Sequence, residues 1–261
     1  MNGTLLVLRC LKRQSFLFLL VVVSFTAFAS GNQLVISKGN TAYSAGNYQE
    51  AIKCYTSLVS EGLESPDLYY NLANSYFKLS DIPHAILWYE RAKRLDPGNE
   101  DISFNLNVAN SKITDKIEPL PEFFLKRWLK TVTNLFSMDF WAVSGIAFIV
   151  VALLFFSLYL ASRVLLLRKL GFWAGFSTLL FSIVFLLFAW FSYSSLNSDQ
   201  SAIIINPTVT VKSSPDEKST DIFVIHEGCK IQLIDHIGNW HEIRIANGSV
   251  GWVEQGNFEK I

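Results

Sequence analysis

Two long uncharged runs restrict what this chain can fold into more than any other feature. Residues 140–162 and 170–198 contain no Asp, Glu, Lys or Arg, in a chain that is 51% hydrophobic and only 17% charged. At about 1.5 Å per residue in a helix, either run is long enough to cross the roughly 30 Å hydrocarbon core of a bilayer. The sequence therefore predicts a two-helix transmembrane hairpin with spans at 140–162 and 170–195. Two core helices of a soluble protein are the alternative.

The charges around these runs predict an orientation. The seven joining residues 163–169, RVLLLRK, include three basic side chains, whereas Asp139 and Asp199 flank the opposite ends. Because basic residues near membrane spans stay in the cytoplasm, the joining turn is predicted to be cytoplasmic. Both flanking regions are then expected on the periplasmic or extracytoplasmic side.

The N-terminus has the pattern of a secretion signal. Basic residues precede an uncharged run at 16–29, which ends at the small residues Ala27 and Ala29. This arrangement is typical of a cleaved signal, so residues 1–29 are predicted to be a signal peptide, with an uncleaved anchor helix as the alternative. Export of the following region agrees with the orientation predicted from the joining turn.

A 34-residue repeat follows the signal. NTAYSAGNYQEAIKCY at 40–55 aligns with NSYFKLSDIPHAILWY at 74–89. The aligned pairs are Gly39 with Ala73, Asn40 with Asn74, Tyr43 with Phe77, Ala51 with Ala85, Ile52 with Ile86 and Tyr55 with Tyr89. Small residues at such positions let paired helices approach closely, and Asn47 and Asp81 are predicted to cap the second helices.

The period and these positions resemble the tetratricopeptide repeat (TPR). The resemblance predicts an all-α domain at 32–116, with repeats at about 32–65 and 66–99 and a capping helix at 100–116. It also implies a peptide-binding groove lined by first-helix residues: Asn40, Tyr43, Tyr70, Asn74, Phe77 and Lys78. Packing between helices and capping are the alternative roles for these side chains. Recognition of a terminal carboxylate is not expected, because Ile36 and Tyr70 occupy a row that is basic in carboxylate-binding TPR domains.

A mixed basic and aromatic segment, residues 117–139, connects the repeats to the first apolar run. After two prolines it places Phe123, Phe124 and Trp128 among Lys126, Arg127 and Lys130. This composition favours an amphipathic interfacial helix that lies on anionic headgroups of the lipid bilayer. A helix packed under the repeats is the alternative.

Short alternating strands separated by turns make up residues 202–261. The segments VTVKSSP, HEG before KIQLID, NWHEIRI, NG and GWV resemble the bacterial SH3-like (SH3b) domain. The resemblance predicts a small all-β barrel that binds either cell-wall peptide or a protein segment. Trp240 and Trp252 are candidates for its ligand groove, although a core position is the alternative for at least one of them.

The sequence contains no recognisable catalytic or metal-binding motif. Cys54 and Cys229 are far apart and belong to no CxxC pair, so both are predicted to be buried apolar side chains. The barrel histidines His226, His236 and His241 lie on alternating strands that would point them to different faces. We therefore expect no metal, cofactor or catalytic residue, and no enzyme. The balance of 22 basic and 22 acidic residues gives no indication of nucleic-acid binding.

The order of these features, including FSMDFWA in the linker, resembles the BatE family of Bat (Bacteroides aerotolerance) proteins along nearly the whole chain. The resemblance implies a bacterial inner-membrane protein. It would act with other Bat proteins, several bearing von Willebrand factor A-type domains, and with a MoxR-type ATPase, in tolerance of oxygen or envelope stress.

The fold expected from the sequence is therefore a multidomain membrane protein with TPR repeats, a transmembrane hairpin and an SH3-like barrel. The leading hypothesis for its function is a scaffold whose TPR groove binds a peptide or helix of a partner membrane protein. The second is an envelope anchor or sensor whose SH3-like domain binds peptidoglycan. A hydrolase that uses Cys229 or His226 is the third.

Overall fold

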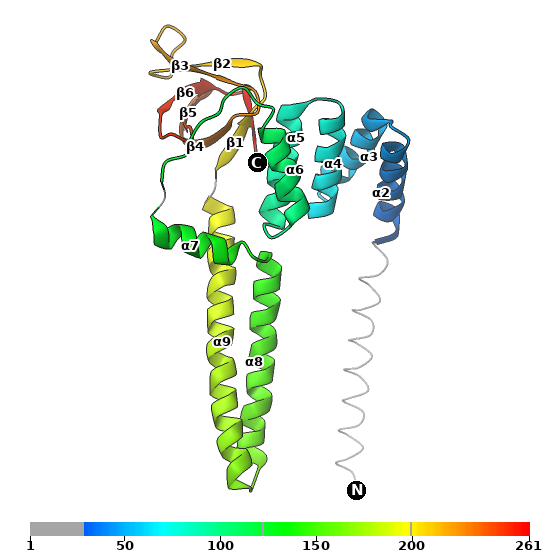
Figure 1. Cartoon of the computed structure of the whole chain (residues 1–261), viewed down its shortest axis with the longest axis vertical. Coiled ribbons are helices and arrows are strands. Elements are labelled where there is room, and N and C mark those ends of the chain that lie inside the picture. The colour runs from blue at the N-terminus through cyan, green and yellow to red at the C-terminus, as the bar shows by residue number, and fades with distance from the viewer. Residues whose placement is uncertain (1–28, 122, 199) are drawn as a thin grey trace. The chain divides into compact units, whose positions relative to one another are not determined.

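The structure is a computed structural model that describes residues 29–121, 123–198 and 200–261 (Figure 1). The chain divides into two compact units, Met1–Glu64 and Ser65–Ile261. The predicted signal peptide, residues 1–29, lies outside the described residues except for Ala29, so it stays a prediction.

The described part of the first unit, residues 29–64, contains the helices α2 (Ala29–Ser44) and α3 (Tyr48–Ser60). Gly46 lies in the turn between them with φ +77°, a left-handed value that glycine adopts without a Cβ clash. The side chain of Asn47 accepts a hydrogen bond from the backbone N–H of Glu50, which confirms the predicted cap of α3. One face of α3 is buried, with Ala51, Cys54, Tyr55 and Leu58.

The second unit begins with three helices, α4 (Pro66–Lys78), α5 (Ile82–Leu95) and α6 (Glu100–Asn110). Asp81 caps α5, as predicted, by accepting a hydrogen bond from the backbone N–H of His84 at 3.3 Å. Ala73 and Ala85 are fully buried, which agrees with a role for small residues in bringing α4 and α5 together. The third helix was expected to reach residue 116 but ends at Asn110. Beyond it the chain runs to the sheet, where Leu120 N–H donates to Ala246 O at 3.1 Å.

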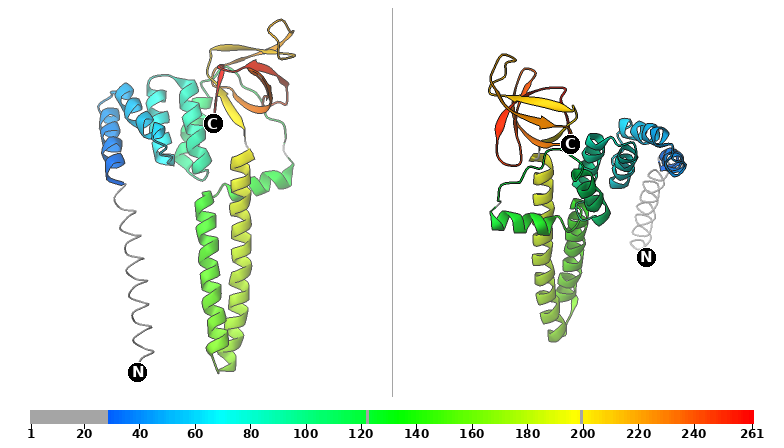
Figure 2. Two further views of the ribbon diagram at one scale, coloured as in Figure 1. Left: turned by 180° about the vertical axis from the view of Figure 1, so that it is seen from behind. Right: turned by 45° about the horizontal axis from the view of Figure 1, so that its top comes forward.

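Helix α7 (Phe124–Thr133) precedes two long helices, α8 (Met138–Ala161) and α9 (Leu165–Ser198), that lie side by side (Figures 1 and 2). Both long helices are apolar and long enough to cross a membrane, and most of their side chains are not buried. The predicted seven-residue turn at 163–169 is wrong, since only residues 162–164 separate the helices. Leu165 and the following Leu and Lys residues have high helix propensity and continue α9.

Small residues allow α8 and α9 to pack closely. A Cβ on Gly171 would lie 2.8 Å from the carbonyl oxygen of Phe155, and a Cβ on Gly145 would lie 2.8 Å from the side chain of Leu186. The buried hydroxyl of Ser182 donates to the carbonyl oxygen of Gly145 at 2.9 Å. Backbone proximity and this hydrogen bond are the interactions by which helices associate in a bilayer.

Residues 201–260 form a separate antiparallel sheet of seven strands. The strands are β1 (Ser201–Ile204), β2 (Thr208–Lys212), β3 (Asp221–His226), β4 (Lys230–Ile237), β5 (Trp240–Arg244), β6 (Val250–Glu254) and β7 (Phe258–Lys260). Their order is β3-β2-β6-β5-β4-β1-β7. A barrel requires its end strands to pair, and within the described residues β3 and β7 do not pair with each other. The prediction of an all-β domain is therefore confirmed, whereas its closure into a barrel is not.

The buried face of this sheet forms a hydrophobic core with contributions from most strands. It consists of Ala202, Ile204, Val209, Val211, Ile225, Cys229, Ile231, Leu233, Ile243, Ile245, Val253 and Phe258. Ile117, from the segment that follows α6, packs against this core. The segment between α6 and α7 therefore contributes to the core of the sheet.

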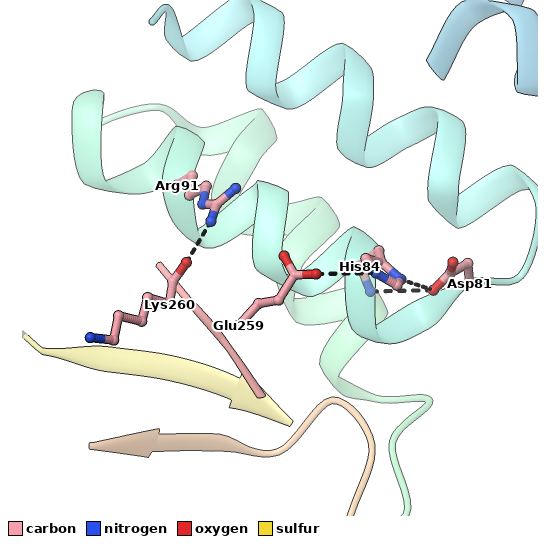
Figure 3. A network of polar contacts seen from close by, with 5 residues as sticks. All are labelled: Asp81, His84, Arg91, Glu259 and Lys260. Carbon is pink, nitrogen blue, oxygen red and sulfur yellow. Dashed lines mark hydrogen bonds and ion pairs between the residues drawn. The ribbon is translucent and has the colours of Figure 1, made fainter. Parts of the chain in front are cut away.

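Helix α5 is tied to the end of the sheet by two arginines. Arg91 Nη2 donates to the carbonyl oxygen of Lys260 at 2.5 Å (Figure 3). Arg94 Nη1 donates to the carbonyl oxygen of Ile261 at 2.7 Å, and Arg94 Nη2 donates to that of Leu196, near the end of α9. Arg94 thus connects the helical repeat, a long apolar helix and the sheet within one unit.

An ion pair and two hydrogen bonds to one carboxylate connect the same parts. The ammonium group of Lys230 lies 2.9 Å from a carboxylate oxygen of Glu90 on α5. Asp115, in the segment after α6, accepts from His226 twice, from the backbone N–H at 2.6 Å and from ring Nδ1 at 2.9 Å. Because a carboxylate only accepts hydrogen bonds, Nδ1 of His226 carries a hydrogen in this contact.

Candidate functional site

Each of the two repeats has the same polar contact between its first and its second helix. In the first unit, the hydroxyl of Tyr55 on α3 donates to Oδ1 of Asn40 on α2 at 2.7 Å. Burial raises the pKa of Tyr55 to about 12, so the hydroxyl keeps its proton and remains a donor. Gly39 leaves room for the ring, because a Cβ there would lie 2.6 Å from Tyr55 Cε1.

The same contact recurs in the second unit. The hydroxyl of Tyr89 on α5 donates to Oδ1 of Asn74 on α4 at 2.5 Å. In both repeats the carboxamide oxygen faces the second helix of its own pair, and the amide nitrogen is left for other partners. The two equivalent asparagines differ in burial, since Asn40 is exposed and Asn74 is half-buried.

Asn74 belongs to a cluster that also includes a residue of α6. Asn105 Nδ2 donates to the hydroxyl of Tyr70 at 2.6 Å and lies 3.5 Å from Asn74 Oδ1. The rings of Tyr70 and Tyr89 are 5.9 Å apart. We call Tyr70, Asn74, Tyr89 and Asn105 the α4–α6 polar cluster. It joins α4, α5 and α6 at the face formed by the first helices.

Asn105 is a site residue that the sequence analysis missed. The signal for it is the same 34-residue offset, because Tyr70, Asn71 and Leu72 align with Phe104, Asn105 and Leu106. The helix expected to be a cap therefore continues the repeat pattern of α4. Its side chains take part in the candidate site.

The remaining predicted groove residues are Tyr43 in the first unit and Phe77 and Lys78 in the second. In the second unit, Lys112 Nζ lies 5.5 Å from the centroid of the half-buried Phe77 ring, a cation–π distance, and Lys78 is exposed. In the first unit, Tyr43 packs edge-on against Tyr48 with centroids 5.3 Å apart. The six predicted residues thus divide between the units, with Asn40 and Tyr43 in the first and the other four in the second.

Trp240 and Trp252 lie on the same face of the sheet. The register of β5 and β6 pairs Trp240 with Glu254 and Glu242 with Trp252. Side chains alternate between the faces of a strand, and Ile243 is fully buried on the opposite face. Both tryptophans are half-exposed and neither belongs to the hydrophobic core.

A histidine of α5 lies at the contact with the last strand of the sheet. His84 Nδ1 is 2.8 Å from Asp81 Oδ1, and its Nε2 is 3.8 Å from Glu259 Oε1 (Figure 3). The hydrogen bond with Asp81 raises the pKa of His84 above its ordinary value, and partial burial opposes that rise. The ring also stacks on Tyr76, with centroids 5.1 Å apart.

The two cysteines of the described residues, Cys54 and Cys229, lie in the protein interior. Cys54 and Cys229 are buried free thiols, and burial raises the pKa of Cys229 to about 12. Such a thiol is almost entirely protonated at neutral pH and is a poor nucleophile. Within the described ranges, no group of three or more His, Cys, Asp or Glu side chains is placed to hold a metal ion.

A comparison with protein-family models supports the repeat assignment. Residues 36–100, about a quarter of the chain, match the family model of the tetratricopeptide repeat, which confirms the predicted TPR repeats in this part. Among solved structures, the first TPR of Spaghetti (RPAP3) bound to the HSP90 peptide SRMEEVD is similar, with 23% sequence identity and a TM-score of 0.19. The similarity covers 31% of this chain and 90% of that one. No curated protein matches the chain.

Proposed function

We propose that this protein is a non-enzymatic scaffold, anchored in a membrane, that binds a peptide or helix of a partner protein through its TPR repeats. The observation that carries the proposal is the repeated Asn–Tyr contact. Tyr55 and Tyr89 donate to the carboxamide oxygens of Asn40 and Asn74, and under this proposal the two amide nitrogens donate to the backbone of the ligand. Side chains that are held in place before binding lose less conformational entropy when the ligand arrives.

The surroundings of Asn74 fit a peptide ligand. Tyr70 and Phe77 are half-buried and offer aromatic surface, and the exposed Lys78 adds a cation beside them. Aromatic side chains supply large contact area with few rotatable bonds, which is why they dominate binding surfaces. Three helices of one unit hold this surface, since the α4–α6 polar cluster fixes Tyr70 through Asn105.

Membrane anchoring would restrict the diffusion of the scaffold and its partner to the plane of one bilayer. The proposed spans are α8 and α9, whose length and composition suit a bilayer. Confinement of two proteins to one membrane raises their effective concentration, so a modest affinity in the TPR surface is sufficient. The basic residues Arg163, Arg168 and Lys169 at the end where α8 and α9 join favour a cytoplasmic turn, with the other domains on the periplasmic side.

The resemblance to the BatE family gives the partner class. Under this proposal the bound segment belongs to another Bat protein of the inner membrane, of the kind that carries a von Willebrand factor A-type domain and works with a MoxR-type ATPase. The scaffold would then take part in tolerance of oxygen or envelope stress. The resemblance rests on the order of features described above.

The test replaces the donors while keeping the internal hydrogen bonds. In the Asn40→Asp/Asn74→Asp variant, the carboxylates still accept from Tyr55 and Tyr89 but have no N–H groups and repel a ligand carbonyl. We expect recovery of crosslinked partners from native membranes to fall by about tenfold or more, the effect of losing two hydrogen bonds. Asn247→Asp in the sheet makes the same kind of charge change on an exposed turn and should leave recovery unchanged. Unaltered recovery in the double variant would show that these asparagines do not bind the ligand.

A second candidate function is binding of peptidoglycan by the SH3-like part. The outward position of Trp240 and Trp252 on one sheet face favours it, because exposed aromatics on a rigid sheet suit a ligand surface. Cosedimentation of the full-length protein with purified peptidoglycan distinguishes the two. Retention that persists in the Asn40→Asp/Asn74→Asp variant supports the second function, and no retention leaves the scaffold alone.

A further inference from the structure

Helix α7 presents an apolar side that no described element covers. Phe124, Leu125 and Trp128 recur at helical spacing and are 72%, 54% and 57% exposed. Such exposure is unusual for three large apolar residues on one short helix and marks a site of interaction. The same helix carries three exposed cations on its other side, namely Lys126, Arg127 and Lys130.

The C-terminal end of α7 is fixed to the apolar helix pair. Thr133 is buried, and its carbonyl oxygen accepts a hydrogen bond from the buried Trp141 Nε1 of α8 at 3.0 Å. Only residues 134–137 separate α7 from α8, and α7 also contacts α9. In Figures 1 and 2, α7 runs across the long axis of α8 and α9 at the end of the pair.

The helical repeat holds this end of α7 from the other side. Gly98, in the turn between α5 and α6, lies so close to the backbone of Leu135 that a Cβ on Gly98 would overlap the carbonyl oxygen of Leu135. The turn after α7, residues 134–137, thus contacts the repeat at Gly98 and adjoins the long helix α8. The direction of α7 is set by protein contacts at this turn, and its exposed side chains are left to meet whatever surrounds the end of the helix pair.

We propose that α7 docks on the bilayer interface, with its apolar side chains at the boundary of headgroups and acyl chains and its cations on anionic phospholipids. This inference rests on the membrane anchoring proposed above and adds the class of lipid. Three observations point to a bilayer as the occupant. Exposed apolar side chains follow α7 along the chain to the start of α8, namely Leu135, Phe136 and Phe140. The helix lies across the spans, as an interfacial helix must.

The third observation is that the basic side chains of α7 have no acidic partner among the described residues. Within the described part of the chain, Lys126, Arg127 and Lys130 form no ion pair with a carboxylate, so their charges are available to a partner. Basic side chains beside a membrane span are attracted by anionic lipid, by roughly fivefold in binding per charge. A neutral lipid surface would satisfy the apolar side of α7 and would give these three cations no counterion.

The depth of α7 can be measured in the full-length protein reconstituted into liposomes. The tryptophan fluorescence of the Trp128→Phe variant, subtracted from that of the wild type, isolates the signal of Trp128. Lipids brominated near the headgroup should quench this signal more than lipids brominated near the end of the acyl chain. A Trp128 signal that neither lipid quenches would overturn the inference, because α7 would then lie away from the bilayer.

The lipid class is tested with Trp128 as the reporter and spin-labelled phosphatidylglycerol or phosphatidylcholine as the quencher. The Lys126→Gln/Arg127→Gln/Lys130→Gln variant should lower the preference for phosphatidylglycerol by about fivefold or more, since one lost charge alone accounts for about that factor. A charge-matched control, Lys53→Gln/Lys116→Gln/Lys218→Gln, changes three exposed lysines on other elements and should keep the preference. Equal loss in both variants, or no loss in either, contradicts anionic-lipid docking by α7.

Extraction separates this inference from the anchoring on which it rests. Alkaline carbonate releases proteins that are only attached to a membrane surface and leaves spanning proteins in the pellet. Release of the wild type would overturn both the anchoring and the docking of α7. Retention together with an unquenched Trp128 would overturn the docking alone and leave the scaffold in place.

Discussion

The contact between Asp115 and His226 gives a prediction whose size follows from the structure. Asp115→Ala removes both acceptors at once and leaves the backbone N–H of His226, on edge strand β3, without the carboxylate that it contacts at 2.6 Å. Hydrogen bonds to a charged group contribute about 1.5–3 kcal/mol each. The side chains of Asp115 and His226 are 16% and 35% exposed, so solvent weakens the pair and we expect a total loss of about 2–3 kcal/mol.

Native-state hydrogen exchange at the His226 amide measures this loss directly. Since each 1.4 kcal/mol is about a tenfold change in an equilibrium, the amide should exchange about 30- to 150-fold faster in Asp115→Ala. Asp115→Asn retains one acceptor and should show a smaller increase. Asp216→Ala removes a carboxylate that accepts from the Lys218 N–H in the loop before β3, and serves as the control.

Two results would refute the reasoning. If the His226 amide exchanges at the wild-type rate in Asp115→Ala, the contact does not hold this end of β3. If every amide of the sheet accelerates equally, the substitution has destabilised the whole sheet, and the local energies assigned to Asp115 and His226 are wrong.

Two further predictions concern the same boundary between helices and sheet. Since the pKa of His84 is raised in the folded protein by Asp81 and Glu259, its stabilising effect is full below the ordinary value near 6.5 and is lost as the pH rises through the folded value. The difference in Tm between wild type and His84→Gln should therefore shrink from pH 6 to pH 8, and a growing difference contradicts the assignment. Gly228→Ala combines a left-handed φ of +81° with a Cβ 2.5 Å from Ile113, so we expect a loss of about 2–3 kcal/mol in unfolding free energy, and a Tm within a degree of wild type would show that the site relaxes freely.

Local patterns in the sequence predicted the helices of the repeats and the N-terminal caps of two of them. The caps Asn47 and Asp81 followed from residue type and position alone, because a cap acts on a backbone group only three residues away. The length of the two uncharged runs, 140–162 and 170–198, predicted the long helices α8 and α9. The same reasoning failed at residues 163–169, where basic residues indicated a turn although Leu, Arg and Lys also favour helix.

Contacts between distant residues were beyond this kind of reasoning. Asp115 and His226 are 111 residues apart, and nothing near either residue indicates its partner. Alternation identified the strands, but it specifies faces and not whether the end strands of a sheet meet. The position of Asn105 could have been predicted, although its contacts could not, because it lies one 34-residue repeat after Asn71.

The contacts of Arg94 have a consequence for the order in which the protein is made. Arg94 and its acceptor Ile261 are separated by 167 residues. At about 5–20 residues per second, the ribosome needs roughly 8 to 33 s to add them. During this interval α5 is complete, but Arg91 and Arg94 lack their acceptors in the sheet. Both long helices are synthesised before the strands that provide these acceptors. The contacts of α5 with the end of the sheet can therefore form only after β7 has been synthesised.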